Sequence, residues 1–141
     1  MRYLIVLLAL AGIVVSGLAL HVHYYHGVEP CDINSHWDCG IVNHSRYSMI
    51  AGVPVAALGI VGYALIAFAA FRRLPAATLV LALIGLGFAL YLSNVEAHVL
   101  EVWCLYCVIS QGIIALITLA AIVFLFRRPK KTLKRRSRII P

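Results

Sequence analysis

Four cysteines are the residues of this chain whose type and spacing best suit chemistry. Cys104 and Cys107 form a Cys-x-x-Cys motif at the start of an apolar stretch, and Cys31 and Cys39 lie in a polar segment between two other apolar stretches. Side chains three positions apart share one face of a helix, so the sulfurs of Cys104 and Cys107 can close a disulfide. The helix dipole favours a thiolate at a helix N-terminus, which makes such a pair reactive. The motif therefore predicts thiol–disulfide redox chemistry.

The cysteines and the six histidines also allow other interpretations. A zinc site would need an irregular ligand spacing, so no metal site is expected. Two structural disulfides would suit an oxidising compartment. Covalent haem attachment needs a His directly after the second cysteine, and Val108 stands there instead. A non-catalytic or haem-carrying membrane subunit with structural disulfides stays open as an alternative, although no histidine falls in the middle of an apolar stretch.

The body that must position these cysteines is solvated mainly by lipid. Hydrophobic residues make up 63% of the chain and charged residues 12%, whereas a soluble domain carries about 25% charged residues. Four charge-free stretches each exceed the ~20 residues that a helix needs to cross a bilayer, and they cover residues 3–28, 47–71, 74–95 and 102–126. Backbone amides in lipid must be bonded within their own segment, which favours helices. The predicted fold is an all-α membrane protein, a four-transmembrane-helix bundle with a long outer loop between its first and second helices.

The charged residues sort by side of the membrane. Apart from Arg46, the basic residues stand at Arg2, in the turn 72–73 and in the tail 127–141, whereas all five acidic residues lie in the first and third connections. The positive-inside rule then places both termini in the cytoplasm and the cysteines on the outer side. Residues 1–126 are expected to form one membrane domain in contact with lipid, followed by a basic cytoplasmic tail. Because the tail supplies most of the positive charge, no nucleic-acid partner is expected.

Together these motifs resemble the vitamin K epoxide reductase family. The resemblance covers roughly residues 15 to 115 in the right order, and two cysteines eight apart in a long loop before a membrane Cys-x-x-Cys are specific to it. The matching pieces are Leu20-His21-Val22, Cys31-Asp32 with Cys39, Ser45 with Tyr47, the segment GVPVAALGIVGY at 52–63, and Tyr91-Leu92 ahead of the Cys-Leu-Tyr-Cys motif.

The resemblance implies a relay of electrons. Cys107 would pass electrons to a quinone of the ubiquinone, menaquinone or vitamin K type, and Cys104 would exchange with Cys39. Cys31 would receive electrons from a thioredoxin-fold protein through mixed disulfides. The implied activity is that of a quinone-dependent thiol–disulfide oxidoreductase that supports disulfide bond formation.

The sequence departs from vertebrate members of the family at positions that bind the naphthoquinone there. Gln111 stands where they carry a Tyr, and Val55 stands where they carry an Asn. Reduction of vitamin K quinone or its epoxide is therefore the alternative activity. Gln111 could donate to a quinone carbonyl or bridge two helices, and Ser45 is a family position beside the site. We expect no fused thioredoxin-like domain, a separate periplasmic or lumenal partner, and a bacterial plasma membrane, with the endoplasmic reticulum as the alternative.

Overall fold

The computed structural model describes residues 2–24, 37, 46 and 49–127. Three predicted site residues, Cys31, Cys39 and Ser45, lie outside the described residues, and so does the tail from residue 128 onward.

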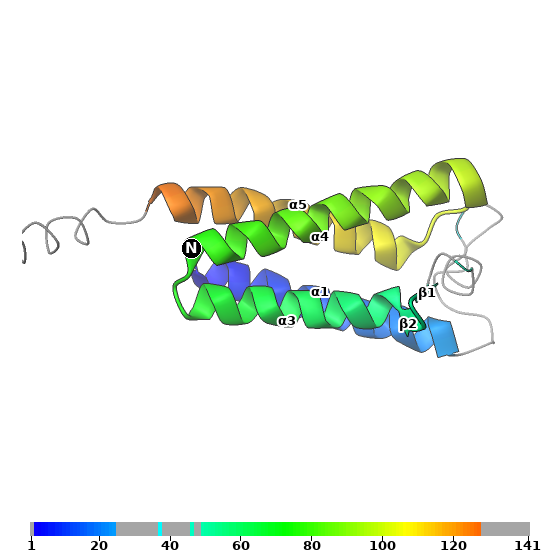
Figure 1. Ribbon diagram of the computed structural model, residues 1–141, viewed down its shortest axis with the longest axis horizontal. Helices are drawn as coiled ribbons and strands as arrows, with labels where there is room; N and C mark the ends of the chain where they lie inside the picture. The colour runs from blue at the N-terminus through cyan, green and yellow to red at the C-terminus, as the bar shows by residue number, and fades with distance from the viewer. Residues whose placement is uncertain (1, 25–36, 38–45, 47–48, 128–141) are drawn as a thin grey trace, which may run out of the picture.

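Four apolar helices make up most of the described chain (Figure 1). They are α1 (Arg2–Tyr24), α3 (Val55–Phe71), α4 (Pro75–Val95) and α5 (Leu105–Phe126). A short antiparallel hairpin of β1 (Met49–Ile50) and β2 (Val53–Pro54) precedes α3, and a π-helix, η2 (Glu96–Leu100), directly continues α4. The hairpin, the end of α1 and the start of α5 lie at one end of the bundle, opposite the turn between α3 and α4 (Figure 1).

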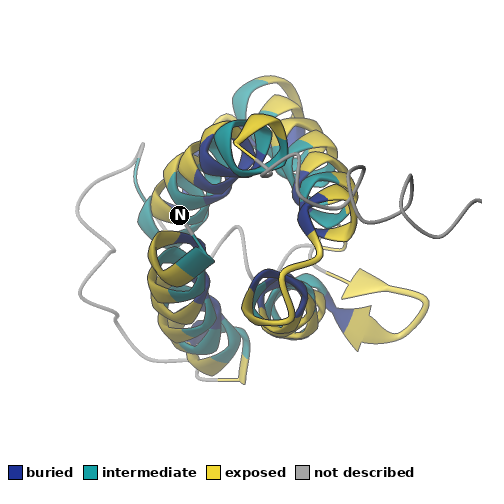
Figure 2. Ribbon diagram, turned by 90° about the vertical axis from the view of Figure 1, so that its left-hand side faces the viewer, coloured by how far each residue is buried: buried dark blue, intermediate teal, exposed yellow. Residues whose placement is uncertain are grey.

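Each helix packs against two neighbours, so that α1, α3, α4 and α5 form a ring in that order (Figure 2). Small side chains let membrane helices approach closely, and Ala9, Ala70, Ala82 and Ala120 all lie in the buried core. Larger side chains fill the space between them, with Ile5, Ile66 and Ile117 almost wholly buried. The contact between α3 and α4 is the loosest of the four.

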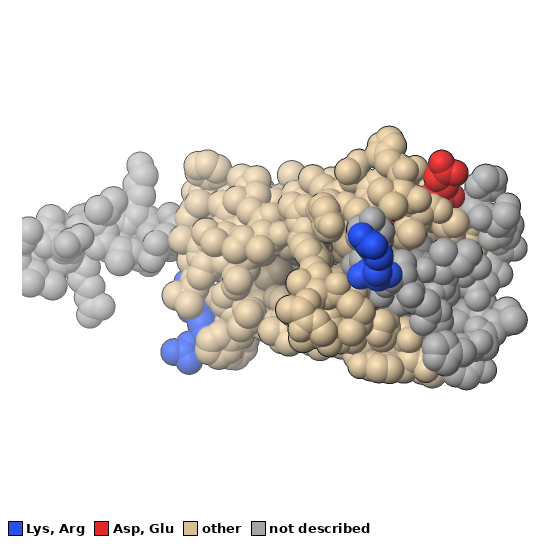
Figure 3. Space-filling view, turned by 45° about the vertical axis from the view of Figure 1, so that its right-hand side comes forward, with Lys and Arg blue, Asp and Glu red and all other residues tan. Residues whose placement is uncertain are grey.

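The outer surface of the bundle is apolar. Large hydrophobic side chains such as Leu7, Ile84 and Leu119 point outward, with more than half of their surface exposed. The flank in Figure 3 is almost free of charged side chains. Three helices of the described chain are long and apolar enough to cross a membrane: Arg2–Tyr24, Pro75–Leu100 and Leu105–Phe126. The fourth, α3, has 17 residues, about 26 Å of helix, which is near the lower limit for a span.

The second predicted helix was expected from residue 47, and this boundary is wrong, because residues 49–54 form the hairpin instead. Ala51 and Gly52 both have left-handed backbone conformations, with φ of 51° and 80°, and glycine adopts that region without a steric penalty. Pro54 has no N–H to donate, which is harmless at the residue before a helix. The last predicted helix also begins later than expected, at Leu105 in place of residue 102, because Trp103 lies in a β-bridge and Cys104 is extended.

Candidate functional site

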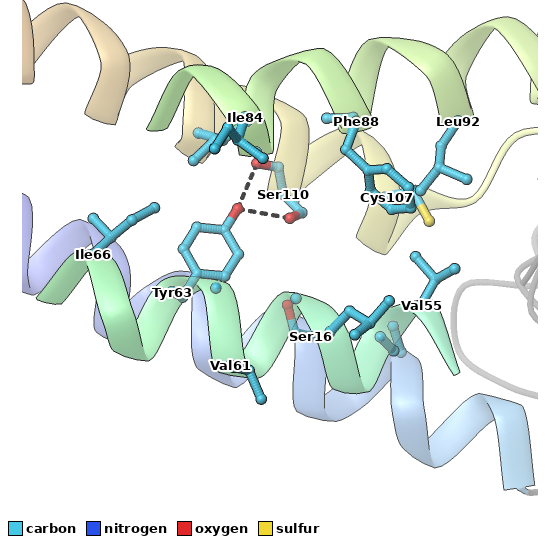
Figure 4. A pocket seen from close by; sticks show the side chains of 18 of the residues that line it. Ser16, Val55, Val61, Tyr63, Ile66, Ile84, Phe88, Leu92, Cys107 and Ser110 are labelled. Atoms are coloured by element: carbon cyan, nitrogen blue, oxygen red, sulfur yellow. Dashed lines mark hydrogen bonds between the residues drawn. The ribbon is translucent and has the colours of Figure 1, made fainter. Parts of the chain in front are cut away.

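A cavity of about 420 Å³ lies inside the bundle, a size typical of pockets for small organic ligands. All four helices contribute to its wall, α3 and α4 most of all (Figure 4). Its lining is mainly aliphatic and aromatic, and the polar members are Ser16, Tyr63, Ser93, Glu96, Tyr106, Cys107 and Ser110.

The cavity opens on the lipid-facing flank between α3 and α4. Leu58 and Leu65 from α3 and Ile84 from α4 line it and are also exposed on the outer surface. This opening follows from the loose contact between the two helices. An apolar molecule dissolved in the bilayer can therefore enter from the side without crossing water.

The two cysteines of the Cys-x-x-Cys motif lie at the N-terminus of α5, where the sequence predicted them. Cys104 is the residue directly before the helix and is completely buried. Its carbonyl oxygen accepts the backbone N–H of Val108 at 3.0 Å. Cys107, one turn further in, lines the cavity (Figure 4), and its side chain is hydrogen-bonded to that of Cys104. Only the deeper sulfur therefore faces the cavity, and the other lies behind it.

Glu96 stands beside both cysteines, although sequence reasoning counted it only as an outer acidic residue. It is 2% exposed and is the first residue of η2. Its Oε2 accepts the backbone N–H of Cys104 at 3.2 Å, and its carboxyl group is hydrogen-bonded to the side chain of Cys107. The signal that could have found it is an acidic residue within a membrane-length apolar segment, which is rarely without a function.

Tyr63 and Ser110 form a polar contact that sequence reasoning also missed. The Tyr63 hydroxyl donates to the Ser110 carbonyl oxygen at 2.9 Å and lies 2.7 Å from the Ser110 hydroxyl. Figure 4 shows the phenol reaching from α3 across the bundle to α5. Gly12 on α1 makes room for the ring, since a Cβ there would stand 2.5 Å from the nearest ring carbon.

The two described residues predicted to bind a quinone differ in their placement. Val55, the first residue of α3, lines the cavity at the end where Cys107 lies (Figure 4). The Gln111 side chain accepts a hydrogen bond from the Ser93 hydroxyl on α4. Among the described residues, Ser93 belongs to the cavity lining and Gln111 does not. The amide of Gln111 thus links two helices behind the wall of the cavity.

Two residues of the outer segment between α1 and the hairpin are described, Trp37 and Arg46, and Trp37 lies beside the cysteine motif. Trp37 pairs with Trp103 in a parallel β-bridge. Trp103 immediately precedes Cys104. The bridge therefore joins the outer segment to the chain that leads into α5.

No metal-binding group emerges from residues 2–24, 37, 46 and 49–127, where no three His, Cys, Asp or Glu side chains gather.

The fold and the site define an integral membrane protein with a helical bundle, a lipid-facing apolar cavity and a pair of cysteines at its wall. The sequence model of the vitamin K epoxide reductase family matches residues 3–123, and the chain belongs to this family. This confirms the resemblance in its motifs. Members of the family are oxidoreductases, and their function is generally membrane-bound, quinone-linked redox chemistry. A comparison with individually curated proteins finds no match.

Proposed function

We propose that this protein is a quinone-dependent thiol–disulfide oxidoreductase that sustains disulfide formation outside the cytoplasm. The observation that carries the proposal is the position of Cys107, which lines a cavity open to lipid while Cys104 is sealed behind it. A quinone is apolar and dissolves in the bilayer, so it reaches this wall through the opening between α3 and α4. The apolar lining fits a quinone ring, and the volume fits a small organic ligand.

The chemistry balances over the whole relay. A partner dithiol loses two electrons and two protons as it becomes a disulfide, and a quinone gains both as it becomes a hydroquinone. Thiolate attack on a disulfide carries the electrons between proteins and between pairs. In the proposed order, Cys31 accepts from a thioredoxin-fold protein, Cys39 exchanges with Cys104, and Cys107 delivers to the quinone.

The bridge between Trp37 and Trp103 supports the exchange between the outer and inner pairs. Cys39 lies two residues after Trp37 along the chain, and two residues of chain span at most about 7 Å. Trp103 is the neighbour of Cys104. The bridge therefore joins the residue two positions before Cys39 to the residue that precedes Cys104, which supports the proposed exchange between these two cysteines.

The remaining parts of the proposal concern the site wall and the orientation. Val55 supplies apolar contact to the quinone, and Gln111 acts through the Ser93 hydroxyl that it holds at the wall. Ser45 stays a prediction. Residues 1–126 form the membrane domain, and both termini and the basic tail face the cytoplasm of a bacterial cell, with the cysteines on the outer side of its plasma membrane.

The decisive experiment is quinone reduction by the purified protein with a small dithiol as electron donor. Cys107→Ser keeps nearly the same shape without the sulfur, and Leu119→Ala changes a lipid-facing residue of the same helix as a matched control. We expect Cys107→Ser to abolish quinone reduction and Leu119→Ala to retain it. Turnover by Cys107→Ser close to that of the native protein would refute the assigned chemistry. Vitamin K epoxide in place of the quinone tests the alternative activity in the same assay.

A further inference from the structure

The carboxyl group of Glu96 lines the cavity beside Cys107 and accepts the backbone N–H of Cys104, and the relay described above gives it no role. We infer that Glu96 is a catalytic residue that takes the proton from the Cys107 thiol and returns it to the reduced quinone. The inference rests on the proposed function, because it assigns the proton transfers of that same reaction.

The geometry places one carboxyl group against both inner cysteines and at the cavity wall. Glu96 is 2% exposed and lines the cavity. It is hydrogen-bonded to the Cys107 side chain and, through Oε2, to the Cys104 backbone N–H. The π-helix and the extended chain after it bring Glu96 and Cys104, eight residues apart in sequence, into this contact. π-Helical turns are frequent at functional sites.

A capping role for α5 does not account for the choice of residue. The Cys104 N–H precedes the helix and needs an acceptor, which a neutral Gln, Asn or Ser side chain would supply at far lower cost. A carboxyl group buried within a membrane-length apolar segment is expensive, and such residues are characteristic of proton and ion pathways. The capping bond also leaves unexplained why the same group contacts the Cys107 thiol and faces the cavity.

The reaction needs a proton acceptor at this place. A thiolate, and not a thiol, is the reactive form of cysteine, and the lipid to which the cavity opens offers no proton acceptor. Among the described residues that line the cavity, Glu96 is the single carboxylic acid. The other polar side chains of the wall, Cys107 apart, carry hydroxyl groups, and a neutral hydroxyl group does not take up the proton of a thiol.

The proposed step balances in protons and electrons. The Glu96 carboxylate takes the proton of the Cys107 thiol and delivers it to one quinone oxygen. The Cys104 thiol then gives up its proton through the same carboxylate to the other quinone oxygen, and its sulfur joins that of Cys107 in a disulfide. The two electrons that the sulfurs release pass to the quinone. The products are one disulfide, one hydroquinone and the Glu96 carboxylate in its starting form.

Glu96→Gln tests the proton transfer, because an amide oxygen still accepts the Cys104 N–H but cannot carry a proton. Glu101→Gln is the matched control, an exposed glutamate in the same connection. With pre-reduced protein and a soluble benzoquinone, we expect Glu96→Gln to lower the single-turnover rate about 100-fold or more. Its quinone KM should stay near the native value, Glu101→Gln should react at the native rate, and Glu96→Asp should recover part of the loss. A Glu96→Gln rate close to native, or a loss confined to KM, would overturn the assignment.

A second measurement needs no quinone and separates proton transfer from a purely structural role. In a Cys104→Ser background, a membrane-permeant maleimide alkylates Cys107, and the thiol proton must leave in that reaction too. We expect Glu96→Gln to slow the alkylation. Faster alkylation would show that the carboxylate merely repels a sulfur anion, and the inference would fall. If the native protein reduced no quinone, the proposed function would fail, whereas slowed alkylation in Glu96→Gln would still support the proton transfer.

Discussion

Gly12 on α1 is the position where one added methyl group should do the most harm to the cavity wall. A Cβ there would stand 2.5 and 2.6 Å from three atoms of the Tyr63 ring, so the ring would have to move. Overpacking of this kind costs about 1–3 kcal/mol. If the ring moves, its two hydrogen bonds with Ser110 are disturbed, at about 1 kcal/mol each. Alanine has a better helix propensity than glycine, which offsets about 1 kcal/mol of this destabilisation.

The balance predicts that Gly12→Ala lowers the free energy of unfolding by about 2–4 kcal/mol. Gly17→Ala is the matched control, because a Cβ at Gly17 on the same helix meets nothing within 4 Å. It should leave stability unchanged or raise it. Chemical or thermal unfolding of the purified protein in one detergent compares the two variants. Equal stability of Gly12→Ala and Gly17→Ala would refute the reasoning. A double-mutant cycle with Tyr63→Leu shows whether the destabilisation arises at the Tyr63 ring, because Gly12→Ala should lower the free energy of unfolding less in that background.

Two further predictions address access to the cavity and the outer segment. Gly62→Leu adds a side chain into the cavity, where a Cβ meets no atom within 4 Å, and should raise the quinone KM roughly tenfold or more. Gly87→Leu on α4, equally open but outside the cavity lining, should not, and equal kinetics of the two variants would place the quinone elsewhere. Trp37→Pro should break the bridge to Trp103 and slow turnover with a reduced thioredoxin-fold protein while a small dithiol still supports the native rate. Trp37→Ala keeps the backbone N–H and should reduce turnover with the protein partner less. Unchanged turnover with that partner in Trp37→Pro would show that the bridge has no role in electron transfer from it.

The length of the charge-free apolar stretches predicted the helices, because lipid requires every backbone amide of a spanning segment to be hydrogen-bonded within that segment. Hydropathy alone misplaced the start of α3, since 49–54 is as apolar as a helix and only Gly52 and Pro54 mark the turn. The Cys-x-x-Cys motif is local, so its place at the start of α5 could be predicted. The contact of Tyr63 with Ser110 joins residues 47 apart in sequence, and no local pattern specifies it. Glu96 was visible in the sequence, but the direction of its side chain depends on the π-helical turn that begins with it.

The different burial of the two inner sulfurs supports a directional relay more strongly than their spacing does. Cys107 contacts the cavity, and a quinone in the cavity meets this sulfur first. Cys104 is fully buried beneath Val22 and Val102, so a lipid-borne molecule does not reach it, and it is adjacent in sequence to the residue bridged to Trp37. In the proposed relay, electrons that arrive from the outer segment therefore cross the Cys104–Cys107 pair before they reach the quinone. The Glu96 carboxyl group contacts both members of that pair, at the place where the proposed reaction transfers protons and electrons to the quinone together.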